Sequence, residues 1–560
     1  MESPAPADVR SWLSGLARVS RRWIQATVLA GILAGLATIV QMVLLAWLVY
    51  QGVIEERAVS TLTPWFFALL GVLVLRSLGQ GLQARFAARC SEQVRQHARR
   101  QLHEHWQSLG PVALADASAA SLTREWLDHV EALHGYFARF LPQMTLATVI
   151  PLFILILVFW LDWLAAIFLL LSAPLIPLFM ALIGMGAEKV NQQHFETISR
   201  LSGQFLDKVR GLTTLQLFDQ TKQASETLYQ RSDQYRHITM KTLKVAFLSS
   251  AVLEFFASVA IAVIAIYIGF GLLGYISFGP SSELTLFSGL LILLLAPEFF
   301  QPLRTLSQHY HDRAAALGAG AEILARLEQP APGPTDPAPA PAPEASDPGA
   351  ITLADITLRY NGGPAVLSHL SLTFNRGEAV ALTGPSGGGK SSLLHLLAGF
   401  IEPDSGSVSV FGQAPGSEPF GWLGQKGFWI QGSWADNLRL TSPGASDIAI
   451  ASALRQVGLA DLLDSREQGI KSRIGEDGQG LSGGQARRLS LARIFLADYD
   501  LIILDEPTAG LDATSEICVL EALHKLAKAG KTLIFSTHHQ ALLTLADRML
   551  IISDGEVRNA

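Results

Sequence analysis

The strongest constraint on this chain is a series of long apolar runs in its first 300 residues. A bilayer core about 30 Å thick needs about 20 apolar residues per helix. Only 16% of the residues are charged, against about 25% in an ordinary soluble protein. We therefore predict a membrane α-helical domain over residues 1–328 with six spans, at about 24–50, 58–84, 140–161, 163–187, 245–282 and 284–303.

The positive charges predict how these spans are oriented. Lys and Arg are concentrated in the two long connections, which follow the second and the fourth predicted span, and the other three connections carry Arg57 alone. Cytoplasmic segments retain Lys and Arg, so both connections and both termini are predicted to be cytoplasmic. The first run exceeds the core of a signal peptide, about 7–15 residues, and is expected to stay as an uncleaved span.

The character of the chain changes after the sixth predicted span. Residues 329–350 are rich in Pro and Ala, which is typical of a semi-extended linker without a core. Residues 351–560 show short Val, Ile and Leu strands, Gly-rich turns and helical stretches, which indicate a soluble α/β domain. The net charge of −6 gives no basic surface, so no nucleic-acid partner is expected.

A phosphate-binding loop is predicted at the start of this α/β domain. A strand at residues 378–383 precedes a G-x-x-x-x-G-K-S sequence and a helix, which is the context such a loop requires. Lys390 is expected on the β- and γ-phosphates, and the Ser391 hydroxyl on Mg²⁺. A Gly-rich structural turn would explain neither the Lys-Ser pair nor the strand. The predicted ATP-binding residues here are Gly384, Pro385, Ser386, Gly387, Gly388, Gly389, Lys390, Ser391 and Ser392.

Two acidic residues follow a second buried-type strand at 501–504. Asp505 suits Mg²⁺ binding, and Glu506 lies where a carboxylate could polarise the attacking water. A solvated turn is the alternative. The phosphate loop in the same domain favours catalysis.

A third motif, at the start of a predicted helix, identifies the family that the α/β domain resembles. Its residues Leu481, Ser482, Gly483, Gly484 and Gln485 resemble the signature of ATP-binding-cassette (ABC) proteins, which acts on the nucleotide of a partner cassette. The resemblance implies that Tyr360 stacks on adenine and that Gln425 senses the metal and the γ-phosphate. It also implies that Asp512 is the acid of the loop that follows the Asp505-Glu506 strand. It implies that His538 is the switch histidine, with the adjacent His539 as the alternative.

A single cassette cannot complete an ABC site, so the resemblance implies a second chain. Six spans, long cytoplasmic extensions and a C-terminal cassette resemble an exporter-type ABC half-transporter, embedded in membrane lipid. In that fold the cytoplasmic loop tips dock on cassettes. We expect the tips near residues 112–119 and 218–224, although ordinary helix turns fit both places.

Segments of the membrane half resemble the CydD family of bacterial inner-membrane half-transporters; they begin at Phe140, Ala173, Leu201, Phe247 and Ala296. That resemblance implies a CydC-like partner in a heterodimer. It also implies export of cysteine or glutathione, or haem handling, in support of cytochrome bd and cytochrome c assembly. A homodimeric lipid or drug exporter and an ATP-gated channel or haem-sensing regulator are the alternatives.

Two carboxylates, Glu254 and Glu298, fall inside predicted spans, where charges are costly and usually face a cavity or a partner. Each could contact an amine-bearing thiol, or form a structural pair with Arg304 or with another helix. Gln301, Arg304, Gln308 and His311 recur at helical spacing and predict one polar stripe on the sixth span. The stripe could line a substrate path, or be a solvated face. His311, beside Tyr310, could alternatively ligate haem iron.

Overall fold

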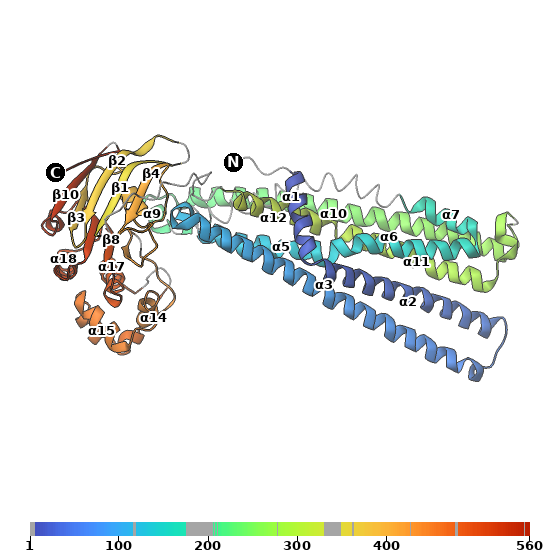
Figure 1. The fold of residues 1–560 in the computed structure, drawn as a ribbon. Helices are drawn as coiled ribbons and strands as arrows, with labels where there is room; N and C mark the ends of the chain where they lie inside the picture. Colours follow the sequence, from blue (N-terminus) through green and yellow to red (C-terminus); the bar gives the residue numbers. More distant parts are fainter. Residues whose placement is uncertain are drawn as a thin grey trace. The chain divides into compact units, whose positions relative to one another are not determined.

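The computed structural model describes residues 6–115, 119–174, 205, 208–209, 211–276, 278–329, 349–360, 363–425, 427–475, 480–553 and 555–559 (Figure 1). The chain forms two compact units. One contains Met1–His105 and Ala117–Gln329, and the other contains Trp106–Asp116 and Pro330–Ala560. We call them the membrane unit and the cassette unit.

The membrane unit contains helices and no strand among its described residues. Its α-helices are α1 (Pro6–Val19), α2 (Arg21–Val53), α3 (Val59–Ala115), α4 (Ala119–Arg124), α5 (Val130–Gly135), α6 (Leu141–Leu161), α7 (Trp163–Ser172), α9 (Leu212–Leu217), α10 (Thr221–Leu272), α11 (Leu286–Gln308) and α12 (Tyr310–Leu327). Two π-helical turns, Glu125–His129 and Tyr136–Phe140, join α4, α5 and α6, and the 3₁₀ turn Gly279–Glu283 precedes α11.

Five described stretches are long and apolar enough to cross a membrane: Arg21–Val53, Val59–Ala115, Ser121–Leu161, Glu254–Leu272 and Leu286–Leu327. A shorter apolar helix, Trp163–Ser172, begins where the fourth predicted span begins. Residues 175–187 of that span lie outside the described residues. The fifth predicted span extends to residue 282, whereas its helix ends at Leu272.

The core of the membrane unit lies between α2, α6, α7, α10 and α11, around the fully buried Phe299 and Phe300. Asp162 fixes the sharp turn from α6 to α7. Its carboxylate accepts the backbone N–H groups of Leu164 and Ala165, each at 2.9 Å, and the Tyr267 hydroxyl at 2.9 Å. This buried acid is fully partnered and therefore structural.

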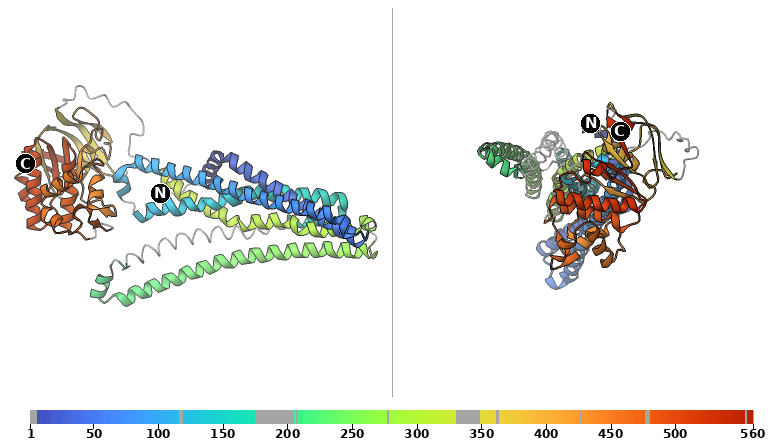
Figure 2. Two further views of the ribbon diagram at one scale, coloured as in Figure 1. Left: turned by 90° about the horizontal axis from the view of Figure 1, so that it is seen from below. Right: turned by 90° about the vertical axis from the view of Figure 1, so that its left-hand side faces the viewer.

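The first half of α10 extends away from this core. It contacts α9, with which it forms a helical hairpin, while its second half packs on α7 and α11 (Figure 2). The turn of the hairpin lies at residues 218–220, with Asp219 in the left-handed region (φ 53°). It falls inside the second predicted loop tip.

A short segment of α3 belongs to the cassette unit. The helix is kinked at Gly110 (φ 72°), and residues Trp106–Asp116 group with the cassette. Val112 packs against the cassette core, and the Gly110 α-carbon faces the Phe400 carbonyl, which would lie 3.4 Å from an added Cβ. The described part of the first predicted tip thus contacts a cassette.

The cassette unit contains two main sheets. An antiparallel sheet has the strand order β2 (Ala365–Asn375), β1 (Ala350–Arg359), β4 (Ser405–Val410). The larger sheet has the order β11 (Glu556–Asn559), β10 (Arg548–Ser553), β3 (Ala379–Thr383), β9 (Thr532–Ser536), β8 (Leu501–Asp505), β5 (Gly421–Leu423). A small pair joins β6 (Gly432–Ser433) and β7 (Arg473–Ile474).

Helices cover these sheets. They are α13 (Lys390–Leu397), which packs on strands of both main sheets, and α14 (Trp434–Arg439), α15 (Asp447–Gln456), α16 (Ala460–Asp464), α17 (Gly483–Ala492), α18 (Ala513–Lys528) and α19 (Gln540–Leu543). Strands β3, β9, β8 and β5 are parallel neighbours. Their carboxyl ends therefore lie at one edge, where ligands of open α/β sheets bind.

Candidate nucleotide site

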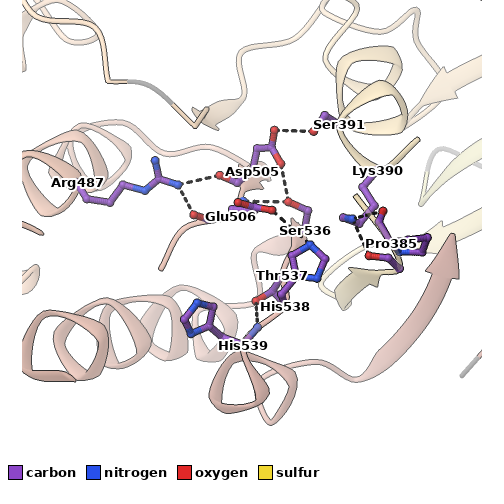
Figure 3. A network of polar contacts seen from close by, with 11 residues as sticks. Pro385, Lys390, Ser391, Arg487, Asp505, Glu506, Ser536, Thr537, His538 and His539 are labelled. Atoms are coloured by element: carbon purple, nitrogen blue, oxygen red, sulfur yellow. Dashed lines mark hydrogen bonds and ion pairs between the residues drawn. The ribbon is translucent and has the colours of Figure 1, made fainter. Parts of the chain in front are cut away.

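The predicted phosphate loop joins the end of β3 to the start of α13. Lys390 is buried, and its Nζ donates to the carbonyls of Gly384 at 2.8 Å and Pro385 at 2.9 Å (Figure 3). Gly384 has φ 133°, and an added Cβ would lie 2.0 Å from the Ile552 carbonyl oxygen. No other residue fits there. Gly389 caps α13 with φ 104°, so the loop turns directly into a helix N-terminus.

Asp505 lies at the end of β8, and two hydroxyls hold its buried carboxylate (Figure 3). Ser391 Oγ donates to one oxygen at 2.9 Å, and Ser536 Oγ donates to the other at 2.6 Å. Hydroxyl and carboxylate oxygens are the donors that Mg²⁺ prefers alongside phosphates. Ser391 and Asp505 therefore fit the predicted magnesium position. Gln425, the third predicted ligand, lies two residues beyond β5 at the same sheet edge.

Glu506 adopts a strained backbone beside the phosphate loop. Its φ is 48°, which is uncommon for a non-Gly residue, and its N–H donates to Ser536 Oγ at 2.9 Å. His538 Nε2 lies 3.5 Å from Glu506 Oε1 (Figure 3), whereas His539 Nδ1 lies 3.2 Å from Glu516 Oε1. This arrangement favours His538 over His539 as the switch histidine.

The signature residues form the start of α17. Ser482 caps the helix by accepting the Gln485 N–H at 3.2 Å, and Gln485 Oε1 accepts the Ser482 N–H at 2.9 Å. Gly484 lies against Ser515, since an added Cβ would be 2.6 Å from its Oγ. Leu481 packs on the cassette core, and Gly483 has open space around its α-carbon.

Asp512 caps α18, directly beside the signature. Its carboxylate accepts the backbone N–H and the hydroxyl of Ser515, each at 2.9 Å. These hydrogen bonds, first the backbone one, hold the pKa of the Asp512 carboxyl below its usual value. The acid is therefore ionised at neutral pH and fixes the turn that leads from Glu506 to α18.

The remaining predicted residues of the ATP site lie around the phosphate loop. Tyr360 follows β1, is 38% exposed, and donates its hydroxyl to Ser392 Oγ at 3.1 Å. An exposed aromatic ring tied to α13 fits the predicted adenine contact. Ser386, Gly387 and Gly388 complete the loop between β3 and α13.

Arg487 is a part of the site that the sequence motifs did not predict. From α17 it donates to five backbone carbonyls: those of Gly424 at 3.1 Å, Gln425 at 2.7 Å, Asp505 at 2.8 Å, Pro507 at 3.2 Å, and Glu506. Burial lowers the pKa of the Arg487 guanidinium, and the nearby Asp505 and Glu506 carboxylates oppose this shift. One side chain thus joins α17 to the segment around Gln425 and to the segment around Asp505 and Glu506, both of which carry predicted site residues.

We predict that Arg487→Ala lowers the kcat of ATP hydrolysis about ten- to hundred-fold, because small displacements of positioned groups cost rates of this order. The KM for ATP should change little. Arg487→Lys should restore only part of the rate, since a point charge cannot reach five carbonyls. Arg488→Ala is the matched control, because Arg488 contacts Gly458 and Gly484 instead. Equal kcat values for the two Ala variants would contradict this positioning role.

The candidate residues of the membrane half separate into different environments. Arg304 Nη1 donates to Glu254 Oε2 at 2.6 Å, so these two residues form the structural pair. Glu298 and Gln301 line a cavity instead. The predicted polar stripe is also divided, because α11 ends at Gln308 and α12 begins at Tyr310.

The two haem-ligand candidates already have polar partners. The Tyr310 hydroxyl accepts from Arg313 Nη1 at 2.8 Å, and the Arg313 guanidinium lies 5.3 Å from the centre of the tyrosine ring. His311 Nε2 lies 3.3 Å from an oxygen of the buried Asp312. These side-chain pairs hold the first turn of α12.

Comparisons with known proteins agree with this architecture. The family described as "ABC transporter transmembrane region" matches residues 24–296, and the family described as "ABC transporter" matches residues 367–509. A solved structure of a bacterial Atm1-family ABC exporter with ATP bound covers 96% of this chain and is covered over 94% of its own length, with a TM-score of 0.80 and 19% identity. The fold is therefore that of an ABC exporter.

Relatives that are similar over nearly the whole chain show which family of ABC transporters it belongs to. The chain is 36% identical to "Transport ATP-binding protein AarD" of Providencia stuartii, over 100% of this chain and 95% of that protein. It is also 36% identical to "Glutathione/L-cysteine transport system ATP-binding/permease protein CydD" of Escherichia coli (strain K12), with the same coverage of 100% and 95%. The CydC protein of that system in Bacillus subtilis (strain 168) is 31% identical over 90% of this chain and 88% of its own. The chain therefore belongs to the CydD family of ABC transporters, which use ATP to drive transport across a membrane.

Proposed function

We propose that this chain pairs with a CydC-like half and exports cysteine or glutathione from the bacterial cytoplasm across the inner membrane. The observation that carries the proposal is the similarity, over the full length, to relatives named for glutathione and L-cysteine transport. That similarity favours a thiol exporter over a homodimeric lipid or drug exporter and over an ATP-gated channel or haem-sensing regulator.

In the proposed mechanism this chain supplies one phosphate loop and one signature. ATP would bind along the Gly384–Ser392 loop, with Lys390 on its phosphates and Tyr360 against adenine. Bound Mg²⁺ would neutralise phosphate charge between Ser391, Gln425 and Asp505. Glu506 would orient the attacking water and His538 would contact the γ-phosphate. The partner's signature would close this site, and residues Leu481–Gln485 would close the partner's.

The positive connections support a cytoplasmic position for both termini, as Lys and Arg are retained on that side. Tyr310 and His311 are the candidate residues for a haem contact. Their pairing with Arg313 and Asp312 supports a structural role for both residues.

We expect inside-out membrane vesicles that contain this chain and its CydC-like partner to accumulate radiolabelled glutathione or cysteine when ATP is added. Vesicles with Lys390→Ala serve as the control for leakage and adsorption. Haem uptake is followed in parallel by its Soret absorption. Accumulation of haem without accumulation of either thiol would contradict the proposed substrate, and accumulation by this chain without a partner would contradict the heterodimer.

A further inference from the structure

A cavity of about 330 Å³ lies inside the membrane unit, between α2, α3, α6 and α11. Its volume is at the lower end of the roughly 300–1,000 Å³ typical of small-molecule sites. Part of its wall is apolar, with Leu146, Ile150 and Ile154 on α6. Another part is strongly polar for a membrane segment, which is costly unless the polar groups bind a ligand or one another.

Most of the polar lining comes from two helix faces, and Thr38 of α2 and Gln143 of α6 add to it. On α3, Arg76, Gln80 and Gln83 are spaced by four and three residues, and on α11, Glu298, Gln301 and Thr305 are spaced by three and four. Residues at such spacings share one face of a helix. The cavity therefore receives a guanidinium from α3 and a carboxylate from α11.

These two charges have no partner of opposite sign among the described residues. Arg76 Nη1 donates to the Gln41 side-chain oxygen at 2.9 Å, a neutral acceptor that orients the guanidinium. The nearby Arg304 is paired with Glu254 rather than with Glu298. Because Pro302 has no N–H, the backbone carbonyl of Glu298 also lacks its helical donor. The cavity thus contains a guanidinium held by Gln41 and a carboxyl group, neither of them in an ion pair among the described residues.

A zwitterionic amino acid or short peptide matches this pair of charges. The fork of Arg76 suits a carboxylate, Glu298 suits an ammonium group, and glutamine amides suit peptide groups. Among the described residues that line the cavity there is no His, Cys, Met or Tyr, the residues that ligate haem iron. It also offers no group specific for a thiol, whose sulfur can contact the apolar wall.

We propose that this cavity binds a zwitterionic amino acid or short peptide, with Arg76 on a carboxylate and Glu298 on the ammonium group. The ligand is recognised by its charges and not by its thiol. This assignment deepens the proposed function and rests on it for the identity of glutathione and cysteine as ligands.

The test is equilibrium binding of radiolabelled glutathione to the purified complex of this chain with its partner half. Loss of one charged hydrogen-bonded contact should weaken binding at least ten-fold in both Arg76→Gln and Glu298→Gln. Arg85→Gln removes an exposed arginine from the same helix and should bind glutathione like the unmodified complex. Arg76→Lys keeps the charge and should recover part of the affinity.

Modified ligands make the test specific for charge. S-methylglutathione should compete as well as glutathione. Glutathione dimethyl ester should compete weakly, and Arg76→Gln should not weaken it further. Binding of glutathione that is unchanged in Arg76→Gln and Glu298→Gln, absent from the unmodified complex, or lost on S-methylation would overturn the proposal.

The vesicle experiment separates this proposal from the proposed function. Thiol accumulation combined with unchanged binding in the Arg76 and Glu298 variants would leave the exporter in place and refute the site. Charge-dependent binding without ATP-dependent accumulation would support the site and refute export.

Discussion

Glu506→Gln should reduce steady-state ATP hydrolysis by at least about a hundred-fold, because a positioned general base contributes roughly 10²–10⁴-fold. The amide cannot accept a proton from water, but it keeps the shape of the side chain and the N–H bond to Ser536. ATP should therefore stay bound. The measurement is phosphate release by the purified complex, together with the nucleotide retained after gel filtration.

Glu516→Gln is the matched control for this variant. Glu516 belongs to the same cassette, lies on α18 and pairs with His539, so its replacement should leave turnover within about two-fold of the unmodified complex. Hydrolysis that continues at the normal rate in Glu506→Gln would refute Glu506 as the base. Loss of turnover in both variants would refute the choice of His538 over His539.

Lys390→Ala should weaken ATP binding by about a hundred-fold or more and abolish transport. Each hydrogen bond to a charged group is worth about 1.5–3 kcal/mol, and the Lys390 ammonium, predicted to contact the phosphates, also donates to two loop carbonyls. Its removal takes away both the cation and the support of the loop. Nucleotide affinity can be measured by displacement of a fluorescent ATP analogue.

Lys525→Ala provides the comparison, since Lys525 is an exposed cation in the last turn of α18. Its replacement should leave ATP affinity unchanged. Substrate accumulation that persists in vesicles carrying Lys390→Ala would mean that this cassette regulates transport rather than powering it.

The sequence alone predicts a nucleotide site because the chemistry of such a site requires certain residue types at fixed spacing. The Lys390-Ser391 pair follows a glycine loop and Asp505-Glu506 follows an apolar strand, and few structural roles demand both patterns in one domain. The strand order β3, β9, β8 then brings His538 to the same edge, which no spacing in the sequence reveals. The choice between His538 and His539 also needed distances.

Other contacts could not be predicted from residue types and spacing alone. Arg487 acts on backbone carbonyls, which every residue possesses, so its partners could not be recognised. A pair of Glu254 with Arg304 was one of the alternatives from the sequence, but the choice of Glu254 over Glu298 depends on how α10 packs on α11. Arg76 could have been recognised from the sequence, since a single arginine inside an apolar span usually has a function. Residues 58–84 were predicted as one span, and this residue was not among the predicted site residues.

The kink at Gly110 makes the folded cassette unit discontinuous in sequence, because residues 106–116 lie more than 200 positions before the first cassette strand. Val112 and Gly110 pack on the cassette around Phe400, so a substitution on one of these surfaces affects its fit to the other. Exchange of cassettes between relatives would separate these two surfaces. A functional chimera would need to carry the α3 segment along with the cassette that it contacts.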